Sequence, residues 1–395
     1  MQTDVLVVGA GPAGLAVAAC LIGQGIRPAI IEKAGDIAAS WRHHYDRLHL
    51  HTVKEHSALP GLPYPKEYPR YVPRAKVVEY LASYARHFDI APHLDEEASA
   101  IARAGGGRWQ TTTRTGRRFL SDSVVIATGA NNQPSAPTFP GQEHYGGELS
   151  HSRSYRNPAP FAGKRVLVAG MGNTGAEIAL DLAEQGIATE ISIRSPINVV
   201  YRDVLGRPTQ LTSMALSRLP ASWGDAIAGV LRDLTVGDLS RYGIETSKAS
   251  PLHDLRVHGR TPVIDVGTVA RIKAGDIGVR PGIREFTHGG VRFADGTEGR
   301  FDAVIMATGY RAGVADLFPD AELQTDAKGL PLGLAGNGAL SGVFFVGFDV
   351  RQAGGLLRTI GMQARELADS LARKGNRPHP GAAQITPSGA AQITS

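Results

Sequence analysis

The stretch "VLVVGAGPAGLAVAACLIG", residues 5–23, decides the fold. It is almost free of polar side chains and is long enough to cross a bilayer as a helix. Its internal glycines and proline would break such a helix in lipid, and the residues before it lack the basic leader of a secretory signal. We therefore expect no integral membrane segment here, and we interpret the glycines as a turn between a strand and a helix.

That turn lies inside a βαβ unit. Hydrophobic patterning predicts a strand over residues 4–8, a helix over 11–23 and a second strand over 28–32. The turn reads GAGPAG, which fits the pattern GxGxxG. In this pattern the first glycine permits the tight turn, the second admits a pyrophosphate, and the third lets the helix pack on the strand. The residues predicted to bind a dinucleotide here are Gly9, Gly11, Pro12, Ala13 and Gly14.

The end of the second strand carries an acid. Glu32 stands where a carboxylate accepts the hydroxyl groups of an adenosine ribose, and Lys33 follows it. A lone GxGxxG is weak evidence, but a complete βαβ unit that ends in an acid is typical of dinucleotide binding. We therefore predict that Glu32 and Lys33 contact the cofactor.

The same arrangement recurs later in the chain. A strand is predicted over residues 165–169, a helix over 176–185 and another strand over 190–194, with GMGNTG between the first strand and the helix. This last strand ends in an arginine, which can pair with a 2′-phosphate and thus favours NADP over NAD. An exposed arginine without a ligand is the alternative. The predicted binding residues are Gly170, Gly172, Asn173, Thr174, Gly175 and Arg194.

Two unlike dinucleotide sites in one chain call for two cofactors, FAD in the first site and NADPH in the second, with a hydride passing between them. Two further stretches, "VVIATGAN" and "VIMATGYR", repeat each other after hydrophobic strands. We interpret them as places where the chain crosses between the two sheets and where glycine lets the backbone approach a cofactor. A plain exit from a strand is the alternative. The residues concerned are Thr128, Gly129, Thr308 and Gly309.

Between the two units, residues 145–155 read YGGELSHSRSY, which matches the fingerprint FxGxxxHxxxY with Tyr145 in place of the first Phe. With the segment that follows the first βαβ unit and "TPVIDVG" at 261–267, this sequence resembles the flavin-containing monooxygenases, and among them the plant YUCCA type. The resemblance implies an α/β fold with two Rossmann-like domains, a larger FAD domain interrupted by a smaller NADPH domain. The expected ranges are 1–157 and 307–375 for the FAD domain, 158–306 for the NADPH domain, and 376–395 for a disordered tail.

The resemblance also implies a chemistry. NADPH would reduce FAD, molecular oxygen would form a hydroperoxyflavin, and one oxygen atom would pass to a small organic substrate, by heteroatom oxygenation or by oxidative decarboxylation of an aromatic 2-oxo acid. Two alternatives remain at this stage. One is an NADPH oxidase or flavin reductase that oxygenates nothing, and the other is a redox-sensing module that binds both cofactors without turnover.

The run "WRHHYDRLHLHTVKEH", residues 41–56, is rich in histidine. His49 and His51 would share one face of a strand, but no third ligand stands at a known metal-site spacing, so we expect no metal. By the resemblance, Trp41 and Arg42 lie beside FAD, and His51 occupies the place of an asparagine that positions NADP and the peroxide. Because histidine titrates near neutral pH and an amide does not, we hypothesise that His51 is catalytic and sets the lifetime of the peroxide. For His151 in the fingerprint, a structural role is the preferred interpretation.

Composition sets the remaining expectations. A chain of 395 residues with a net charge of +5 and no long charged blocks is typical of two globular domains and does not require nucleic acid. The single cysteine, Cys20, excludes an intramolecular disulfide and is compatible with a cytoplasmic location. Helical pieces within residues 201–260 are expected to lie near the substrate cleft. The sequence leaves the substrate and the oligomeric state open.

Overall fold

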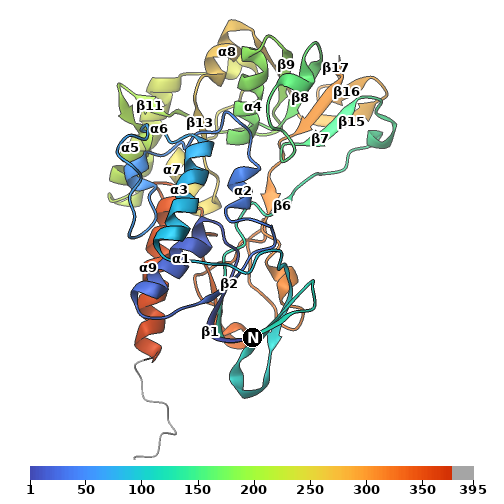
Figure 1. Cartoon of the computed structure of the whole chain (residues 1–395). Helices are drawn as coiled ribbons and strands as arrows, with labels where there is room; N and C mark the ends of the chain where they lie inside the picture. The colour runs from blue at the N-terminus through green and yellow to red at the C-terminus, as the bar shows by residue number, and fades with distance from the viewer. Residues whose placement is uncertain (376–395) are drawn as a thin grey trace, which may run out of the picture.

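The structure is a computed structural model, and it describes residues 1–375. The expected disordered tail, residues 376–395, lies outside the described residues. Two sheets organise the described part of the chain, one at each end of the molecule in Figure 1. The expected class, α/β with two Rossmann-like units, is confirmed. No helix among the described residues has the length and apolar character needed to cross a membrane.

The first sheet has β5 at its centre, with β1 beside it. β1 pairs in parallel with β2 and β5, and β5 pairs in parallel with β20, while β4 and β3 extend the sheet in antiparallel fashion. Val5 to Val8 are buried because both faces of a central parallel strand are covered. The strands are β1 (Gln2–Val8), β2 (Ala29–Ile31), β3 (Ala98–Arg103), β4 (Trp109–Thr113), β5 (Arg118–Ile126) and β20 (Val343–Phe345).

Helices pack on one face of this sheet. α1 (Pro12–Gly23) is rich in alanine and begins with proline, which suits the first turn of a helix, and its side chains are almost all buried. α9 (Leu356–Gly375) packs against α1, and its buried Ile360, Ala364 and Leu367 recur at helical spacing. α2 (Ala39–Arg42) and α3 (Arg74–His87) lie on the same side.

The second sheet is wholly parallel, in the order β14-β9-β8-β18-β7. α4 (Asn173–Glu184) and α8 (Thr268–Ala274) pack on it, and an antiparallel sheet of β15, β16 and β17 lies beside it. The strands are β7 (Glu148–His151), β8 (Arg165–Ala169), β9 (Ala188–Ser192), β14 (Ile277–Arg280), β15 (Ile283–Thr287), β16 (Gly290–Phe293), β17 (Glu298–Arg300) and β18 (Ala303–Met306).

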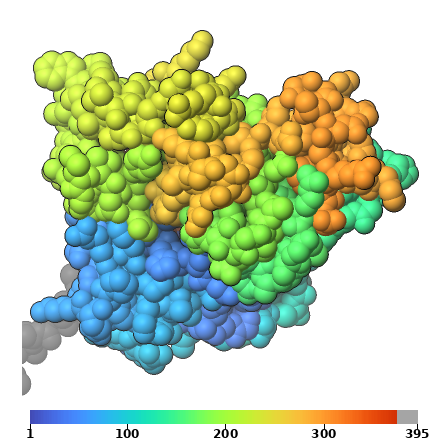
Figure 2. Space-filling view, turned by 90° about the horizontal axis from the view of Figure 1, so that it is seen from above, coloured from blue at the N-terminus to red at the C-terminus, as the bar shows by residue number. Residues whose placement is uncertain are grey.

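A helical insertion separates β10 (Val199–Tyr201) from β13 (Val263–Asp265), which pair with each other in parallel. It forms one corner of the face seen in Figure 2, where residues 200–260 are yellow-green to yellow. Its elements are β11 (Asp203–Val204), β12 (Arg207–Pro208), α5 (Thr209–Leu216), α6 (Ala221–Val236) and α7 (Pro251–His258).

Most predicted element bounds agree with the structure, and two shift. The helix expected from residue 176 begins at Asn173, because Gly172 is the extended residue that caps it. The strand expected over 190–194 is β9, residues 188–192, because Ala188 and Thr189 already pair with β8. Arg194 therefore lies in the loop just beyond the strand.

Candidate functional site

The first glycine turn has the geometry that its sequence predicts. Gly9 adopts a φ of +110°, and a Cβ on Gly14 would lie 1.9 Å from the carbonyl oxygen of Gly9, so both positions require glycine. A Cβ on Gly11, by contrast, would meet nothing within 4 Å. Open space at Gly11, in front of the N-terminus of α1, fits a pyrophosphate group.

Glu32 is buried at the end of β2. Its carboxylate accepts hydrogen bonds from the main-chain N–H groups of Ala10 (2.7 Å) and Ala34 (3.0 Å). A carboxylate has about four lone-pair positions, so ribose hydroxyl groups can still bind. Lys33 donates to the side-chain oxygen of Asn132 at 2.7 Å, so its ammonium group is engaged within the protein.

The ATG stretch after β5 closes this turn. A Cβ on Gly9 would lie 2.6 Å from the carbonyl oxygen of Ala127, and the next residue is Thr128. The Thr128 hydroxyl is buried and has no hydrogen-bond partner within the described residues. A buried hydroxyl without a partner is costly, so a ligand at this turn would supply what the protein lacks.

The second glycine turn repeats the first. Gly170 has a φ of +108°, a Cβ on Gly175 would lie 1.9 Å from the Gly170 oxygen, and a Cβ on Gly172 would meet nothing within 4 Å. A Cβ on Gly170 would lie 2.7 Å from the oxygen of Ala307 in the second ATG stretch. Each ATG loop thus closes its own turn.

The expected crossing between the sheets takes place at these two loops. Beyond Gly129 the chain forms β6 (Gln133–Pro134), and beyond Gly309 it forms β19 (Tyr310–Arg311). β6 and β19 pair in antiparallel fashion as the chain leaves one unit and returns to it. Unlike Thr128, Thr308 has a partner for its hydroxyl, the carbonyl oxygen of Ser135.

The side chain of Asn173 is hydrogen-bonded within the protein. Its side-chain oxygen accepts from the N–H of Ile264 (2.7 Å) and its NH2 group donates to the oxygen of Pro262 (3.2 Å). The side chain thus holds β13 against the glycine turn, which leaves the main-chain N–H of Asn173 for a ligand. Thr174, also predicted to bind, lies beside the phenol of Tyr45 from the first unit.

Arg194 is exposed, and its guanidinium makes no hydrogen bond or ion pair with the described residues. Glu190 on β9 pairs with Arg280 on β14 at 2.5 Å, so this acid is engaged with another cation. A free cation just beyond the second strand fits a 2′-phosphate.

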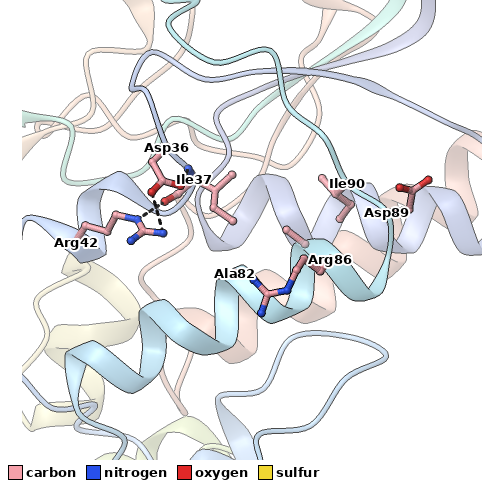
Figure 3. Close-up of a pocket in the computed structure, with 8 residues that line it drawn as sticks. Asp36, Ile37, Arg42, Ala82, Arg86, Asp89 and Ile90 are labelled. Carbon is pink, nitrogen blue, oxygen red and sulfur yellow. Dashed lines mark hydrogen bonds and ion pairs between the residues drawn. The ribbon is translucent and has the colours of Figure 1, made fainter.

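Arg42 faces a surface cleft between the loop before α2 and the helix α3, with a volume of about 500 Å³. Its guanidinium donates to the oxygen of Ile37 (3.0 Å) and pairs with Asp36 (3.0 Å), as Figure 3 shows. No glycine of the first turn lines this cleft. Arg42 therefore fixes the loop that leads to Trp41, whose ring packs against the core around α1.

His51 joins the two units. Its Nε2 makes a short hydrogen bond with the carboxylate of Glu177 on α4, and both side chains are largely buried. Tyr45, also in the first unit, is buried beside the same carboxylate, and burial followed by the charge of Glu177 raises the pKa of this phenol. His44 lies next to this pair, and burial lowers its pKa.

Two further acids on α4 extend this junction. Arg47 pairs with Glu184 at 2.8 Å and with Asp181 at 3.4 Å. Tyr155 donates to Asp181 at 2.7 Å. Burial raises the pKa of the Asp181 carboxyl, while Tyr155 and Arg47 oppose that rise. The acids recur at spacings of four and three residues, which places them on one face of α4.

The fingerprint between the units is structural. Tyr145 donates to the oxygen of Phe301 (2.9 Å), and His151 bonds through its two ring nitrogens to the oxygen of Gly309 and the N–H of Arg153. Burial lowers the pKa of His151. With Tyr155, these side chains fasten the linker to the second unit.

A cleft of about 460 Å³, lined by three arginines that are each paired with an acid, lies where the units meet. The first unit supplies Arg47, Arg70 and Tyr71, and the second supplies Arg202. The guanidinium of Arg202 lies 4.0 Å from the centre of the Tyr71 ring and pairs with Asp203 at 3.4 Å. Arg70 also approaches the Asp203 carboxylate, at 4.0 Å, and Tyr71 donates to it at 2.6 Å. The other lining residues are His49, His51, Pro69, Glu177 and Val266.

The acids of α4 and the arginines of the cleft were not predicted from the sequence. A pattern that indicates the acids is present, because three acids at helical spacing follow the second glycine turn. The cleft had no such signal, since its arginines come from loops that are far apart in the chain. His49 hydrogen-bonds through Nδ1 to the Arg47 oxygen, and His51 bonds through Nε2 to Glu177.

The chain has two dinucleotide turns, one with an acid at the end of its second strand and the other with an arginine that no described residue pairs. This combination defines a flavoprotein that takes its electrons from a second nucleotide. Residues 2–322 match the family described as flavin-binding monooxygenase-like. The chain belongs to this family, and it is an NADPH-dependent flavoprotein monooxygenase with the cofactors FAD and NADPH.

Individual relatives cover most of the chain. It is 38% identical over 362 residues to the indole-3-pyruvate monooxygenase YUCCA1 of Oryza sativa subsp. japonica. The aligned region covers 90% of this chain and 88% of the relative. It is 37% identical over 380 residues to the indole-3-pyruvate monooxygenase YUCCA6 of Arabidopsis thaliana, at 93% and 90% coverage. Among solved structures, a flavin-containing monooxygenase from Stenotrophomonas maltophilia is similar with a TM-score of 0.72 and 25% identity, covering 95% of this chain and 99% of that one.

Proposed function

We propose that this monooxygenase acts on an aromatic 2-oxo acid, which it oxidises with loss of carbon dioxide. The observation that supports this most is the arginine-lined cleft beside His51, because arginine side chains are well suited to hold a carboxylate. Asp203, which pairs with Arg202 and Arg70, would share these cations with the substrate. The plant relatives that carry the name indole-3-pyruvate monooxygenase act on a substrate of this class.

The reaction balances as follows. The 2-oxo acid, O2, NADPH and a proton give the carboxylic acid that is one carbon shorter, with carbon dioxide, water and NADP+. The bound cofactors supply the hydride and the activation of oxygen. In this proposal the residues of the chain hold the carboxylate, orient the carbonyl group and keep water away while the oxygen atom is transferred.

Individual residues take the following roles in the proposal. Gly11 and Gly172 admit the two pyrophosphates, and Arg194 pairs with the 2′-phosphate of NADPH. Glu177 fixes the ring of His51, so that His51 faces the bound nicotinamide and the reacting oxygen. Binding of FAD falls to Gly9, Pro12, Ala13, Gly14, Glu32, Lys33, Trp41, Arg42, Thr128 and Gly129, and binding of NADPH to Gly170, Asn173, Thr174, Gly175, Thr308 and Gly309.

The domain bounds are also part of the proposal. We assign residues 1–157 and 307–375 to the FAD domain and 158–306 to the NADPH domain. One segment inside the first range packs with the NADPH domain instead, because β7 (Glu148–His151) pairs with β18. A cytoplasmic location accords with a single cysteine and the use of NADPH, and fractionation of cells that express a tagged chain tests it.

The test is a substrate panel under air with NADPH, read by mass spectrometry. We expect the flavin-loaded enzyme to convert indole-3-pyruvate to the acid one carbon shorter, and to leave its methyl ester unchanged because the ester lacks the charge. Oxygenated amines or sulfides as the preferred products would assign the enzyme to heteroatom oxygenation. NADPH oxidation that yields only hydrogen peroxide would contradict the proposed activity.

A matched pair of variants tests the cleft. Arg202→Gln should raise the KM for the 2-oxo acid about tenfold, in line with the loss of one hydrogen bond to a charged group, and leave the KM for NADPH unchanged. Arg300→Gln is the control, because Arg300 is exposed in the same unit and makes no side-chain hydrogen bond or ion pair with the described residues. Equal KM values for the 2-oxo acid in the two variants would exclude the cleft as the site that binds its carboxylate.

A further inference from the structure

Gln210 is a buried polar residue of α5, the first helix of the insertion in the second unit. Its side-chain oxygen accepts a hydrogen bond from the main-chain N–H of Val53 at 2.7 Å, and its NH2 group donates to the carbonyl oxygen of Gly354 at 2.6 Å. Both partners belong to the first unit, in segments that are far apart in the sequence. One side chain of the second unit thus joins two loops of the first.

The amide of Gln210 has a single orientation in this position, because the Val53 N–H can only donate and the Gly354 carbonyl can only accept. The helix that carries it is also fixed. Thr209, directly before Gln210, donates from its hydroxyl to the oxygen of Tyr201 at 2.5 Å, and Tyr201 is the last residue of β10. Hydrogen bonds depend on direction, so this anchored amide fixes the positions of both loops more sharply than apolar packing does.

The Gly354 carbonyl belongs to a turn that leads into α9. Gly354 and Gly355 have φ values of +102° and +94°, a left-handed conformation that favours glycine. A Cβ on Gly354 would lie 3.0 Å from the Sδ atom of Met214 on α5, and a Cβ on Gly355 would lie 2.7 Å from the Cγ2 atom of Thr52. The Gly354–Gly355 turn is therefore enclosed between the two units, and Figure 1 shows α5 above the upper end of α9.

This turn lies at the edge of the first sheet where the first glycine turn also lies. A Cβ on Gly347, shortly after β20, would lie 3.0 Å from the Cβ of Ala13 in that glycine turn. The segment 347–355 therefore runs along the carboxyl ends of the parallel strands β1, β5 and β20, and ligands of open parallel sheets bind outside these ends. With FAD in the first turn, this segment forms part of the rim around the cofactor.

The other loop that Gln210 holds carries His51, and we call residues 51–53 the His51 loop. The His51 ring bonds through Nε2 to Glu177 on α4, and the Val53 N–H bonds to Gln210 on α5. Two helices of the second unit thus hold this short loop at its two ends. Gln210 alone connects it to the Gly354–Gly355 turn through a pair of hydrogen bonds from one side chain.

We propose that Gln210 is a positioning residue of the oxygenation reaction, which keeps the His51 loop and the Gly354–Gly355 turn together and closes this rim against water. Without its two bonds, the Val53 N–H and the Gly354 oxygen take water as their partner, and water enters beside the cofactor. NADPH, O2 and a proton then give NADP+ and hydrogen peroxide, without an oxygenated product. The inference rests on the class of enzyme and on FAD in the first turn, and it is independent of the substrate.

Gln210→Met tests the proposal, because methionine has a similar length and shape and no group that can replace the two hydrogen bonds. Under air and without substrate, the flavin-loaded variant should convert NADPH to hydrogen peroxide about tenfold faster than the wild type, in line with the loss of these bonds. Its flavin content and its KM for NADPH should be unchanged. Gln185→Met is the control, because Gln185 is exposed in the same unit and its side chain makes no hydrogen bond with the described residues.

Hydrogen exchange of the same flavin-loaded proteins, measured by mass spectrometry without NADPH, gives a readout that does not depend on activity. The Val53 amide should exchange about tenfold faster in Gln210→Met than in the wild type or in Gln185→Met. Unchanged exchange would overturn the proposal, since Gln210 would then not hold the His51 loop. Faster exchange with an unchanged rate of peroxide formation would also overturn it and leave Gln210 a purely structural contact.

Gln210→Glu separates the two bonds and replaces Gln210→Met if that variant does not fold. Its carboxyl group still accepts from Val53, so the Val53 amide should stay protected, but an ionised carboxylate cannot donate to Gly354. The rate of peroxide formation should therefore be raised at high pH and return toward that of the wild type as the carboxyl group takes up a proton. Comparison with Gln210→Met at equal pH removes the effect of every other titrating group. Equal pH profiles of the two variants, or loss of FAD from both, would contradict the positioning role.

Discussion

The two glycine turns are nearly identical, but the residues around them differ. Gly9 and Gly170 have φ values of +110° and +108°, and the third glycine of each turn approaches the first equally closely. The first turn is completed by a buried acid, Glu32, and by the Thr128 hydroxyl, which has no partner in the described part of the chain. The second is completed by Arg194, whose charge no described residue pairs, and its Thr308 hydroxyl is already bonded. The shared turn makes a dinucleotide site, and the residues around it select the dinucleotide.

Breaking the turns should have the largest effects. Gly14→Val places a side chain against the Gly9 backbone and should abolish FAD binding and folding of the first unit. Gly175→Val should leave FAD bound but remove activity with NADPH, because the corresponding clash lies in the second unit. Flavin absorbance and NADPH oxidation measure the two losses. Flavin retained in Gly14→Val would contradict the assignment of FAD to the first turn.

A milder pair of variants separates folding from binding. Gly11→Ala and Gly172→Ala add a methyl group in open space, so the fold should persist and only cofactor affinity should fall. We expect unchanged circular dichroism, with weaker FAD binding in the first variant and a higher KM for NADPH in the second.

Charge reversal at the end of the second strand should have the next largest effect. Arg194→Glu removes a charge-assisted hydrogen bond and adds repulsion, so kcat/KM for NADPH should fall about tenfold to a hundredfold, while that for NADH changes little. Steady-state kinetics with both nucleotides measures this. Arg300→Glu is the matched control, and an equal loss in both variants would show that only the general surface charge matters.

Variants of the His51–Glu177 contact between the units should have a smaller effect on activity. His51→Asn and Glu177→Gln should each lower the share of NADPH that yields product and raise the share lost as hydrogen peroxide. Because the two residues act through one hydrogen bond, the double variant should be no worse than either single variant. Additive losses would show that the residues act independently.

The smallest effect concerns stability. Burial lowers the pKa of His44 below its ordinary value of 6.5. Below pH 6.5 the unfolded chain therefore binds a proton that the folded chain resists, and the free energy of unfolding should fall with falling pH, by at most about 1.4 kcal/mol per pH unit. His44→Gln should reduce this slope, measured by urea unfolding. His87→Gln, at an exposed position, should not.

The contrast between the two turns also shows what sequence can predict. Strands and helices around GAGPAG and GMGNTG follow from local patterning, and the structure places them with shifts of a few residues. Asn173 was predicted to bind the cofactor, and this stays a prediction. The structure adds that its side chain holds β13, a contact that local patterning does not predict because Pro262 and Ile264 come from a segment that is distant in sequence. His51 was predicted to face the cofactor, and its bond to Glu177 depends on how the two units pack. Contacts between units cannot be derived from local periodicity.

Oxygen labelling tests the central claim most directly. The flavin-loaded enzyme is given NADPH, indole-3-pyruvate and 18O2, and the product is analysed by mass spectrometry together with NADPH consumption and carbon dioxide release. We predict one labelled oxygen atom in the shortened acid, with one NADPH consumed and one carbon dioxide released per product. Consumption of NADPH with unlabelled organic compounds and stoichiometric labelled hydrogen peroxide would contradict the account.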